Sequence, residues 1–528
     1  MAKSAIVIGG GIGGIATAGL LARDGYQVTL VEAHARLGGR AGLWEKDGFR
    51  FDTGPSWYLM PEVFDHWYKL MGTSAKEQLN LTKLDPGYRV YFEPQGGRAA
   101  EHIDVRASRE ENLDLLEQIE PGSRATMEKY LDSAKETYEI AKEYFLYTSF
   151  QDLRTLLVPA VLKRVGTLFR LLTTPIMTFA KKHTNNPKIQ QLLGYPAVFL
   201  GSSPYIAPSM FHLMSYLDLE DGVLYAEGGF TRVIDSMRAI IEDHGVTILT
   251  QATVRAITTE KSSGKARATG VNYDDAHGNT HSLLADFVVS TTDLHHSETQ
   301  LLPSELQTYP QSYWDKKVAG PSAVLLYLGV KGEVPELLHH TLFFTEDWEA
   351  NFSKIFAEKP TVPNPASLYV CKPSATDSNV APSGHTNVFV LVPMPADVAL
   401  GRGGINGSGD KTIEDIADRA IQQIAHWSGA TDFADRIVLR RSVGPADFQN
   451  DLNAWSGTAL GPAHTLMQSA LFRSGNVSKR VEGLYFAGSS TIPGIGLPMC
   501  LISAEVLVKR VRGDVSTSPL PEPLIPVG

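Results

Sequence analysis

The sequence predicts an α/β protein whose central parallel sheet is assembled from segments that lie far apart in the chain. An apolar strand at residues 4–8 leads into a glycine-rich turn and a helix, the order in which a strand–helix–strand unit begins. Buried strands of similar character are expected at residues 285–290 and 483–488, and a helix reaching about residue 512 follows the second of these. The rest of the 528 residues is enough for a second domain of mixed α and β structure.

Composition and charge exclude several classes of protein. Apolar residues make up 43% of the chain and charged residues 20%, so a large core can form and a disordered or fibrous chain is excluded. The net charge of −10 argues against a nucleic-acid partner, which usually requires a basic excess. Two cysteines, Cys371 and Cys500, are too few for a disulfide framework or a cysteine-ligated metal cluster, and they fit a reducing cytoplasm. No apolar run reaches the roughly 18 residues of a membrane-spanning helix.

The N-terminal turn reads GGGIGG and places Gly9, Gly11 and Gly14 in the G-x-G-x-x-G register. Gly9 permits the turn, Gly11 lets the backbone approach a pyrophosphate, and Gly14 lets the following helix pack on the sheet. A second strand at residues 27–31 leads to Glu32, whose carboxylate can accept the ribose hydroxyls and disfavours a 2′-phosphate. A bare structural turn would explain the glycines alone, whereas the order strand, turn, helix, strand and acid predicts dinucleotide binding.

The residues that follow Glu32 indicate which dinucleotide is bound. They read E-x-x-x-R-x-G-G-R, so that Gly38 and Gly39 allow a second close backbone approach and Arg36 and Arg40 can meet phosphate charge. In this form the sequence resembles the FAD-binding signature of the flavin amine oxidase and carotenoid desaturase superfamily. The resemblance implies a tightly held FAD in a discontinuous, Rossmann-like domain of the GR2 type.

The same resemblance implies further contacts with the cofactor. In the relatives, the turn at residues 54–56 passes beside the isoalloxazine ring, and the residue at the position of Val254 meets the adenine through backbone atoms. The strand that ends at Gly488 is followed by Ser489, where many flavoenzymes have an acid, which puts that side-chain contact in doubt. A helix that starts at residues 497–498 would aim its N-terminus at the flavin edge that becomes negative on reduction. The expected cofactor-binding residues are therefore Gly9, Gly11, Gly14, Glu32, Arg36, Gly39, Arg40, Gly54, Pro55, Ser56, Val254, Gly488, Ser489, Leu497 and Pro498.

Three longer stretches, at residues 200–209, 373–385 and 457–498, resemble the bacterial and fungal phytoene desaturase family. One departure is Ser474, where that family usually has a proline. The resemblance covers nearly the whole chain and implies an FAD-dependent desaturation of phytoene or a related colourless polyene in carotenoid biosynthesis. Hydride would pass to the flavin and a proton would leave the adjacent carbon, with oxygen or a quinone as the final electron acceptor.

Several other activities remain open at this point. The family also contains diapophytoene desaturases, carotenoid ketolases, carotenoid isomerases and retinol saturases. A flavin oxidase of amines or porphyrinogens is a second enzymatic alternative, and a non-catalytic isoprenoid carrier is a third possibility. The complete set of glycines from Gly9 to Gly39, with Arg40, argues against a carrier that has lost FAD.

A basic, apolar segment at residues 151–182 independently suggests a lipid substrate. It contains six basic residues and one acidic residue in a chain of net negative charge, and Pro159 and Pro175 should divide it into short helices. Such a segment suits the surface of an anionic bilayer, so we expect a peripheral membrane protein on the cytoplasmic side. An ordinary pair of core helices with a solvated basic face is the alternative.

These features give a provisional division of the chain. The FAD-binding domain is expected at 1–100, 225–300 and 445–512, the substrate-binding and membrane-associating domain at 101–224 and 301–444, and a flexible tail at 513–528. The substrate domain is predicted to be mixed α+β with a helical, membrane-facing part and a long apolar tunnel. The oligomeric state is left open, although an oligomer is possible.

No general base can be identified from the sequence. Arg170 is a candidate for stabilising developing charge, but a membrane-facing or solvated arginine is the more favoured reading. The pairs His295–His296 and His339–His340 suggest a metal site only superficially, because adjacent residues on a strand or helix point apart. We therefore expect neither pair to bind a metal.

Overall fold

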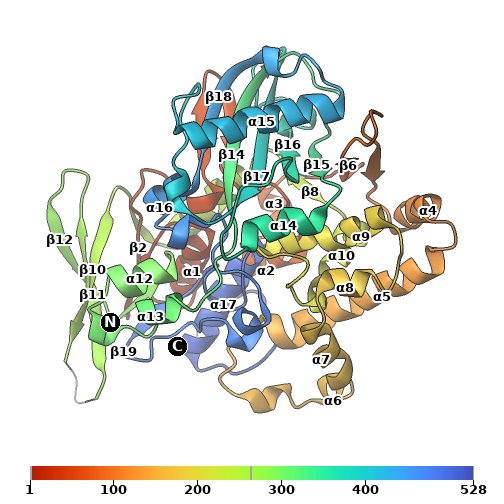
Figure 1. Cartoon of the computed structure of the whole chain (residues 1–528). Helices are drawn as coiled ribbons and strands as arrows, with labels where there is room; N and C mark the ends of the chain where they lie inside the picture. The colour runs from red at the N-terminus through yellow and green to blue at the C-terminus, as the bar shows by residue number, and fades with distance from the viewer. Residues whose placement is uncertain (1–2, 262–263, 527–528) are drawn as a thin grey trace.

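A computed structural model describes residues 3–261 and 264–526 of the chain. Figure 1 shows two sheets in separate parts of the molecule, with a group of helices beside them. The lower part holds the parallel sheet that the glycine-rich turn predicts, and the upper part holds a larger sheet covered by α15 (Lys411–Ser428).

The five-stranded sheet is built from three distant parts of the chain, as expected. Its order is β20–β13–β1–β2–β9, and every neighbouring pair is parallel. Both faces are covered, so most residues of these strands are apolar and buried. The strands are β1 (Ser4–Ile8), β2 (Gln27–Val31), β9 (Thr247–Leu249), β13 (Phe287–Ser290) and β20 (Leu484–Phe486).

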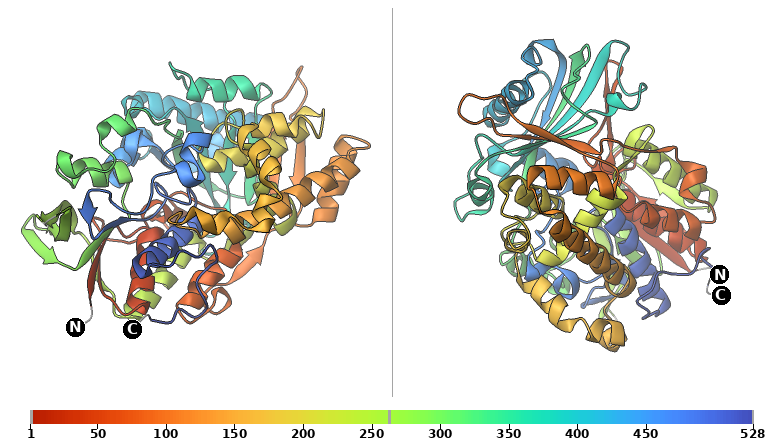
Figure 2. Two further views of the ribbon diagram at one scale, coloured as in Figure 1. Left: turned by 90° about the horizontal axis from the view of Figure 1, so that it is seen from below. Right: turned by 90° about the vertical axis from the view of Figure 1, so that its right-hand side faces the viewer.

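Helices cover one face of this sheet and a small antiparallel sheet covers the other. On the helical face, α1 packs against α17 and α11 (Figures 1 and 2). The opposite face packs on β10, β11 and β12, with β19 parallel to β11. The elements are α1 (Ile12–Arg23), α2 (Pro61–Leu70), α3 (Ala75–Gln78), α11 (Gly229–Asp243), α17 (Leu497–Arg512), β10 (Thr253–Glu260), β11 (Ala266–Asp274), β12 (Thr280–Leu284), β19 (Val481–Glu482), α12 (Leu294–Gln300) and α13 (Gln311–Trp314).

The seven-stranded sheet has the order β18–β14–β17–β16–β15–β6–β7 and is antiparallel except for the pair β6 and β15. One face packs against α15, and the other turns its aromatic side chains toward the hairpin β3–β4. Because β6 belongs to this sheet, the boundary expected at residue 100 falls too late in the chain. The strands are β3 (Leu43–Lys46), β4 (Phe49–Asp52), β6 (Tyr88–Phe92), β7 (His102–Val105), β14 (Ser322–Lys331), β15 (His340–Phe344), β16 (Leu368–Cys371), β17 (His385–Met394) and β18 (Ile437–Val443).

A helical part lies beside the seven-stranded sheet, and α6 and α7 lie at its far end (Figure 1). As predicted, Pro159 opens one short helix and Pro175 precedes another. Among the described residues, no helix combines the length and apolarity needed to cross a bilayer. The remaining elements are α4 (Arg109–Ile119), α5 (Arg124–Ile140), α6 (Pro159–Leu162), α7 (Val165–Thr173), α8 (Ile176–Ala180), α9 (Pro187–Gly194), α10 (Met214–Tyr216), α14 (Trp348–Phe356), α16 (Pro445–Leu452), β5 (Leu81–Lys83) and β8 (Leu224–Ala226).

The C-terminal tail is packed against the domain over the residues that the structure describes, which corrects the expectation of a flexible tail at 513–528. Leu520 and Leu524 are 5% and 1% exposed. The backbone N–H of Leu524 donates to the carbonyl oxygen of Leu70 at 3.1 Å, and that of Leu520 donates to the Glu505 carboxylate at 2.5 Å. The tail is therefore docked on α2 and α17 by two apolar anchors.

Candidate functional site

The glycine-rich turn between β1 and α1 contains both a tight packing contact and an open space. Gly9 has φ +97°, and a Cβ on Gly14 would lie 1.9 Å from the Gly9 carbonyl oxygen, so the helix can approach the strand only with glycine at position 14. In contrast, a Cβ on Gly11 would meet no atom within 4 Å. Gly11 caps α1, so the open space lies at the helix N-terminus, where a pyrophosphate would find free N–H groups.

The second pair of glycines folds back onto the first turn. The Gly38 N–H donates to the Gly10 carbonyl oxygen at 2.8 Å, and a Cβ on Gly39 would lie 3.2 Å from the Cα of Gly11. The two glycine strings that the sequence singled out therefore form one surface. A side chain at Gly39 would press on the Gly11 backbone, so glycine at position 39 permits this approach.

Glu32 is buried at the end of β2 and is held by the backbone around it. Its carboxylate accepts the N–H of Gly10 at 2.6 Å and the N–H of His34 at 2.8 Å. The Ala252 N–H donates to the Glu32 carbonyl oxygen at 2.9 Å, which brings the start of β10 and the buried Val254 alongside. The adenosine end of a dinucleotide would thus meet Glu32 and Val254 together.

The two arginines of the second motif have different surroundings. Arg40 donates from Nε to the Ala459 carbonyl oxygen at 2.8 Å, and its buried Nη2 has no partner among the described residues. A buried, unpaired guanidinium nitrogen is costly, and an anion placed there would satisfy it. The side chain of Arg36 is 55% exposed and lies 3.9 Å from the carboxylates of Glu45 and Asp235. Of the two, Arg40 is the residue whose geometry fits a phosphate.

The turn at residues 54–56 lies directly over Arg40. A Cβ on Gly54 would be 2.6 Å from the Arg40 carbonyl oxygen, so this position also requires glycine. Ser56 shares a 2.6 Å hydrogen bond with the hydroxyl of Tyr369, and Tyr327 donates to the Thr53 carbonyl oxygen at 2.9 Å. The seven-stranded sheet therefore fixes the position of this turn.

Asp52, two residues before Gly54, was not predicted as a site residue, but it connects this turn to the start of α11. Its carboxylate accepts the N–H of Phe230 at 2.7 Å and of Thr231 at 3.1 Å, at the start of α11. Burial raises the pKa of Asp52 above its usual value, and these hydrogen bonds oppose that rise. Asp52 therefore joins the turn to the first residues of α11, a long-range pairing that local sequence does not show.

The C-terminal segment completes the site from the opposite side. Gly488 adopts φ +103°, and a Cβ on Gly13 would lie 3.4 Å from its Cα, so the two ends of the chain meet. Arg473 is buried and donates to the carbonyl oxygens of Ser489 at 2.5 Å and Thr491 at 3.0 Å. Burial lowers the pKa of Arg473 to about 10. Arg473 lies in the stretch 457–498 that resembles the phytoene desaturases, but its role in holding this loop depends on contacts that the sequence does not show.

The helix α17 begins where expected, just after this loop. Gly496 is its N-cap with φ +114°, and Leu497 and Pro498 form its first turn. No acidic side chain lies in that turn, so its N–H groups can face a developing negative charge.

A small pocket adjoins the turn at residues 54–56. Its walls combine apolar side chains with polar ones, among them Asp52, Ser56 and Asn387. Its lining includes Phe51, Tyr58, Tyr225, Phe230, His339 and Cys371.

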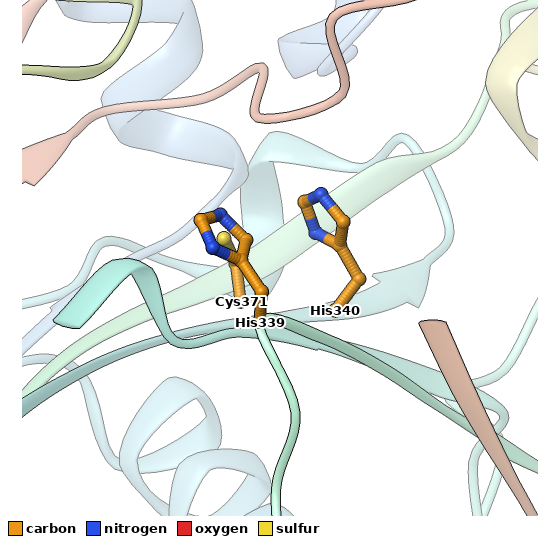
Figure 3. Close-up of side chains that lie close together, drawn as sticks. All are labelled: His339, His340 and Cys371. Atoms are coloured by element: carbon orange, nitrogen blue, oxygen red, sulfur yellow. The ribbon is translucent and has the colours of Figure 1, made fainter. Parts of the chain in front are cut away.

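One predicted relationship on the pocket wall is wrong. His339 and His340 were expected to point apart, but their ring centroids are 4.6 Å apart and both rings lie on the same side (Figure 3). His340 is the first residue of β15 and His339 precedes the strand, so the alternation of a regular strand does not apply to the pair. Burial lowers the pKa of His339 to about 3 and raises that of the nearby Cys371 thiol to about 12. The pair His295–His296 lies outside this pocket, on α12. There, His295 forms a solvent-exposed hydrogen bond of 2.9 Å with the side chain of Gln311.

Arg170 is exposed on α7 and does not line this pocket. It neighbours Phe169, whose side chain is 67% exposed. This position fits the interpretation of Arg170 as a membrane-facing or solvated arginine. It does not support a role for Arg170 in catalysis. To stabilise charge that develops on a substrate in the pocket, a guanidinium group would have to lie within contact distance of that substrate.

Comparison with known proteins gives matches over almost the whole chain. The family model for flavin-containing amine oxidoreductases matches residues 12–511. The carotenoid 3,4-desaturase of Haloarcula japonica is 40% identical over 510 residues, which are 97% of this chain and 98% of that protein. The phytoene desaturase of Fusarium fujikuroi is 31% identical over 97% of this chain and 90% of that protein. The 4,4'-diapophytoene desaturase of Staphylococcus haemolyticus is 30% identical over 96% of this chain and 98% of that protein.

Solved structures share the fold at lower identity. An oxidoreductase from Methanosarcina mazei aligns with a TM-score of 0.61 and 15% identity over 96% of this chain and all of that one. A putrescine oxidase bound to putrescine aligns with a TM-score of 0.60 and 13% identity over 98% of this chain and 99% of that one.

Proposed function

Because the chain belongs to the flavin-containing amine oxidoreductases and, within them, to the carotenoid desaturases, we propose that it introduces double bonds into phytoene or a related colourless polyene. It is an FAD-dependent oxidoreductase that acts on CH–CH bonds in carotenoid biosynthesis. The observation that carries this function is the 40% identity to a carotenoid desaturase over 97% of the chain. FAD, when bound, supplies the hydride acceptor that no amino-acid side chain can provide.

Each part of the cofactor has a matching group in the proposed site. The pyrophosphate would lie in the space before Gly11, with the unpaired Nη2 of Arg40 directed at phosphate charge. Glu32 would accept the ribose hydroxyls, and Val254 would contact the adenine through its backbone. The flavin ring would lie at the end of the site opposite to Glu32 and Val254. Its predicted contacts there are Gly54, Pro55, Ser56, Gly488, Ser489, Leu497 and Pro498.

The substrate is a hydrophobic polyene, and its chain length is a matter for experiment. The named activities of the relatives include both phytoene and diapophytoene desaturation, so we propose a test panel that contains both compounds. A carotenoid still saturated at the 3,4 position should be included because of the 40% identical relative. We propose oxygen or a quinone as the electron acceptor.

We further propose that the enzyme binds a membrane surface through α6, α7 and the segment before them. Five large apolar side chains there are between 50% and 67% exposed, which is unusual for a group of this size on a water-facing surface. Basic residues are interspersed with them, so the face matches an anionic bilayer in both charge and apolarity. We define this apolar basic face by Leu153, Leu157, Leu162, Val165 and Phe169 with Arg154, Lys163, Arg164 and Arg170.

The direct test is pigment analysis of a phytoene-accumulating bacterium that expresses this chain. Coloured products with lengthened conjugation are expected, and colourless cells would count against phytoene as the substrate. The purified yellow protein should also be incubated with the substrate panel in liposomes and, separately, with amines. Turnover of amines without any change in the polyenes would instead favour an amine oxidase, and failure to bind FAD would favour a carrier.

A further inference from the structure

We propose that His339, His340 and Cys371 form a binding site for one transition-metal ion, with zinc as the best match to the ligand set. One ligand atom from each residue lies within 4.8 Å of the other two, and all three side chains are buried (Figure 3). Two imidazoles and a thiolate favour Zn²⁺ over Mg²⁺ or Ca²⁺, which take oxygen ligands. This inference differs from the sequence expectation that neither histidine pair binds a metal.

The sheet itself brings the three side chains together. His340 and Cys371 are directly opposite each other in the antiparallel pair β15 and β16, which puts their side chains on the same face. The Lys372 N–H donates to the His339 carbonyl oxygen at 2.7 Å, so the backbone pairing continues past the end of the strand. Zinc ligands at about 2.0–2.3 Å from the ion require a contraction of only about 1 Å in this cluster.

The orientation of both imidazoles is a second, independent observation. His339 bonds through Nδ1 to the hydroxyl of Thr376 at 2.8 Å, and His340 bonds through Nδ1 to the hydroxyl of Tyr369 at 2.7 Å. The Nε2 atoms of both rings are buried and have no partner among the described residues. Metal-binding histidines have this arrangement, in which one ring nitrogen is held by a neighbour and the other is left for the ion.

The surrounding charges tolerate a bound cation. A Zn²⁺ ion with one thiolate carries a net charge of about +1. The buried carboxylates of Asp377 and Asp52 interact favourably with that charge from the side of α11, whereas the ammonium of Lys372 opposes it. Lys372 is turned away and donates to the Val334 carbonyl oxygen at 2.7 Å.

The position of the cluster leaves one side of the ion open. His339 and Cys371 both line the pocket, so a fourth ligand could come from solvent or from an occupant of the pocket. Three protein ligands and one open position are the arrangement of zinc sites that contact a ligand. The site is proposed independently of flavin binding and does not depend on the desaturase assignment.

The test is a Co²⁺ titration of the FAD-loaded protein after chelator dialysis. We expect one Co²⁺ per chain, with ligand-field bands to the red of the flavin absorption, and displacement by one equivalent of Zn²⁺. X-ray absorption on the zinc-loaded protein should show one sulfur and at least two nitrogens around the metal. Either the absence of stoichiometric binding by the wild type or a coordination shell without sulfur would overturn the proposal.

Matched variants distinguish this cluster from other sites. Cys371→Ala and His339→Gln should each weaken Co²⁺ binding by about a hundredfold. Cys500→Ala and His296→Gln, which change the second cysteine and the other histidine pair, should bind Co²⁺ as the wild type does. Equal binding by Cys371→Ala and the wild type would refute the site. Circular dichroism and flavin absorbance show whether each variant is folded. If a variant is not folded, the Co²⁺ titration and the X-ray absorption of the wild type alone decide whether the metal site exists.

Discussion

Gly13 in the first helix and Gly488 near the C-terminus are in contact distance, since a Cβ on Gly13 would lie 3.4 Å from the Cα of Gly488. The glycine-containing turns at Gly9–Gly14 and at Gly488 therefore lie side by side, although they are far apart in the chain. This contact also explains why the helix α1 packs against α17, because small residues let the two helices and the loop approach closely.

Gly11→Val should give folded but colourless protein. A side chain at this position meets no protein atom within 4 Å, but it occupies the space assigned to the pyrophosphate. The measurements are flavin absorbance of the purified protein and its circular dichroism. Gly166→Ala is a suitable control, because that glycine is exposed in α7 and also has nothing within 4 Å. A yellow Gly11→Val protein with full FAD content would contradict the site.

Gly14→Ala should destabilise the fold itself. The added Cβ would lie 1.9 Å from the carbonyl oxygen of Gly9, so the strand and helix must separate, at a cost of roughly 3 kcal/mol or more. The check is the free energy of unfolding in denaturant, compared between this variant and Gly11→Val. Equal stability of Gly14→Ala and the wild type would show that the observed packing does not exist in solution.

Arg40→Ala and Arg36→Ala should differ in their effect on FAD affinity. Arg40 has a buried, unpaired Nη2, whereas Arg36 is half exposed beside two carboxylates. Loss of a charged hydrogen bond at Arg40 should weaken FAD binding by roughly 1.5–3 kcal/mol, about ten- to a hundredfold. Fluorescence titration of the apoprotein with FAD gives both affinities. A larger effect of Arg36→Ala would reverse the assignment.

Phe169→Glu should reduce binding to anionic liposomes. Its side chain is 67% exposed on α7 and would be buried in the bilayer boundary in the proposed bound state, where it contributes roughly 2 kcal/mol, or about thirtyfold in partitioning. Flotation with vesicles of anionic and neutral lipids measures the effect, and high salt should weaken binding by the wild type. Leu284→Glu, at a 75% exposed position on β12, serves as the control. Unchanged flotation of Phe169→Glu would exclude this face.

Deprotonation of Glu298 should lower the free energy of unfolding as the pH rises from about 4.5 to 7. Its carboxyl accepts the N–H groups of Thr308 and Tyr309, but burial raises its pKa to about 7. A raised folded-state pKa means that the stability contributed by the protonated form is fully present below about pH 4.5 and is lost as the pH passes 7. The loss amounts to roughly 3 kcal/mol. Thermal unfolding of wild type and Glu298→Gln from pH 5 to 8 tests this, and parallel curves would contradict it.

The local parts of the nucleotide site were predictable from the sequence because each is encoded by neighbouring residues. β1 and β2 have the expected bounds, and the turn between them follows from glycine spacing alone. α1 begins at Ile12, directly after the turn, and it includes Gly13 and Gly14 although glycine has a low helix propensity.

Contacts between distant segments could not be predicted in this way. The hydrogen bond between Ser56 and Tyr369 and the cross-strand pair of His340 and Cys371 depend on the register of the seven-stranded sheet, which no local pattern fixes. The docking of Leu520 and Leu524 was missed for a similar reason, because a proline-rich tail shows no periodic signal for burial.

The last strand of the nucleotide sheet, β20, and the helix after it occupy residues 484–512, far along the chain from the glycine-rich turn that follows β1. A ribosome-bound chain that still lacks these residues contains the glycine-rich turn after β1 but not the C-terminal part of the proposed FAD site. Loading of the prosthetic group therefore has to wait until these residues have been synthesised, and chains terminated before them should accumulate as apoprotein.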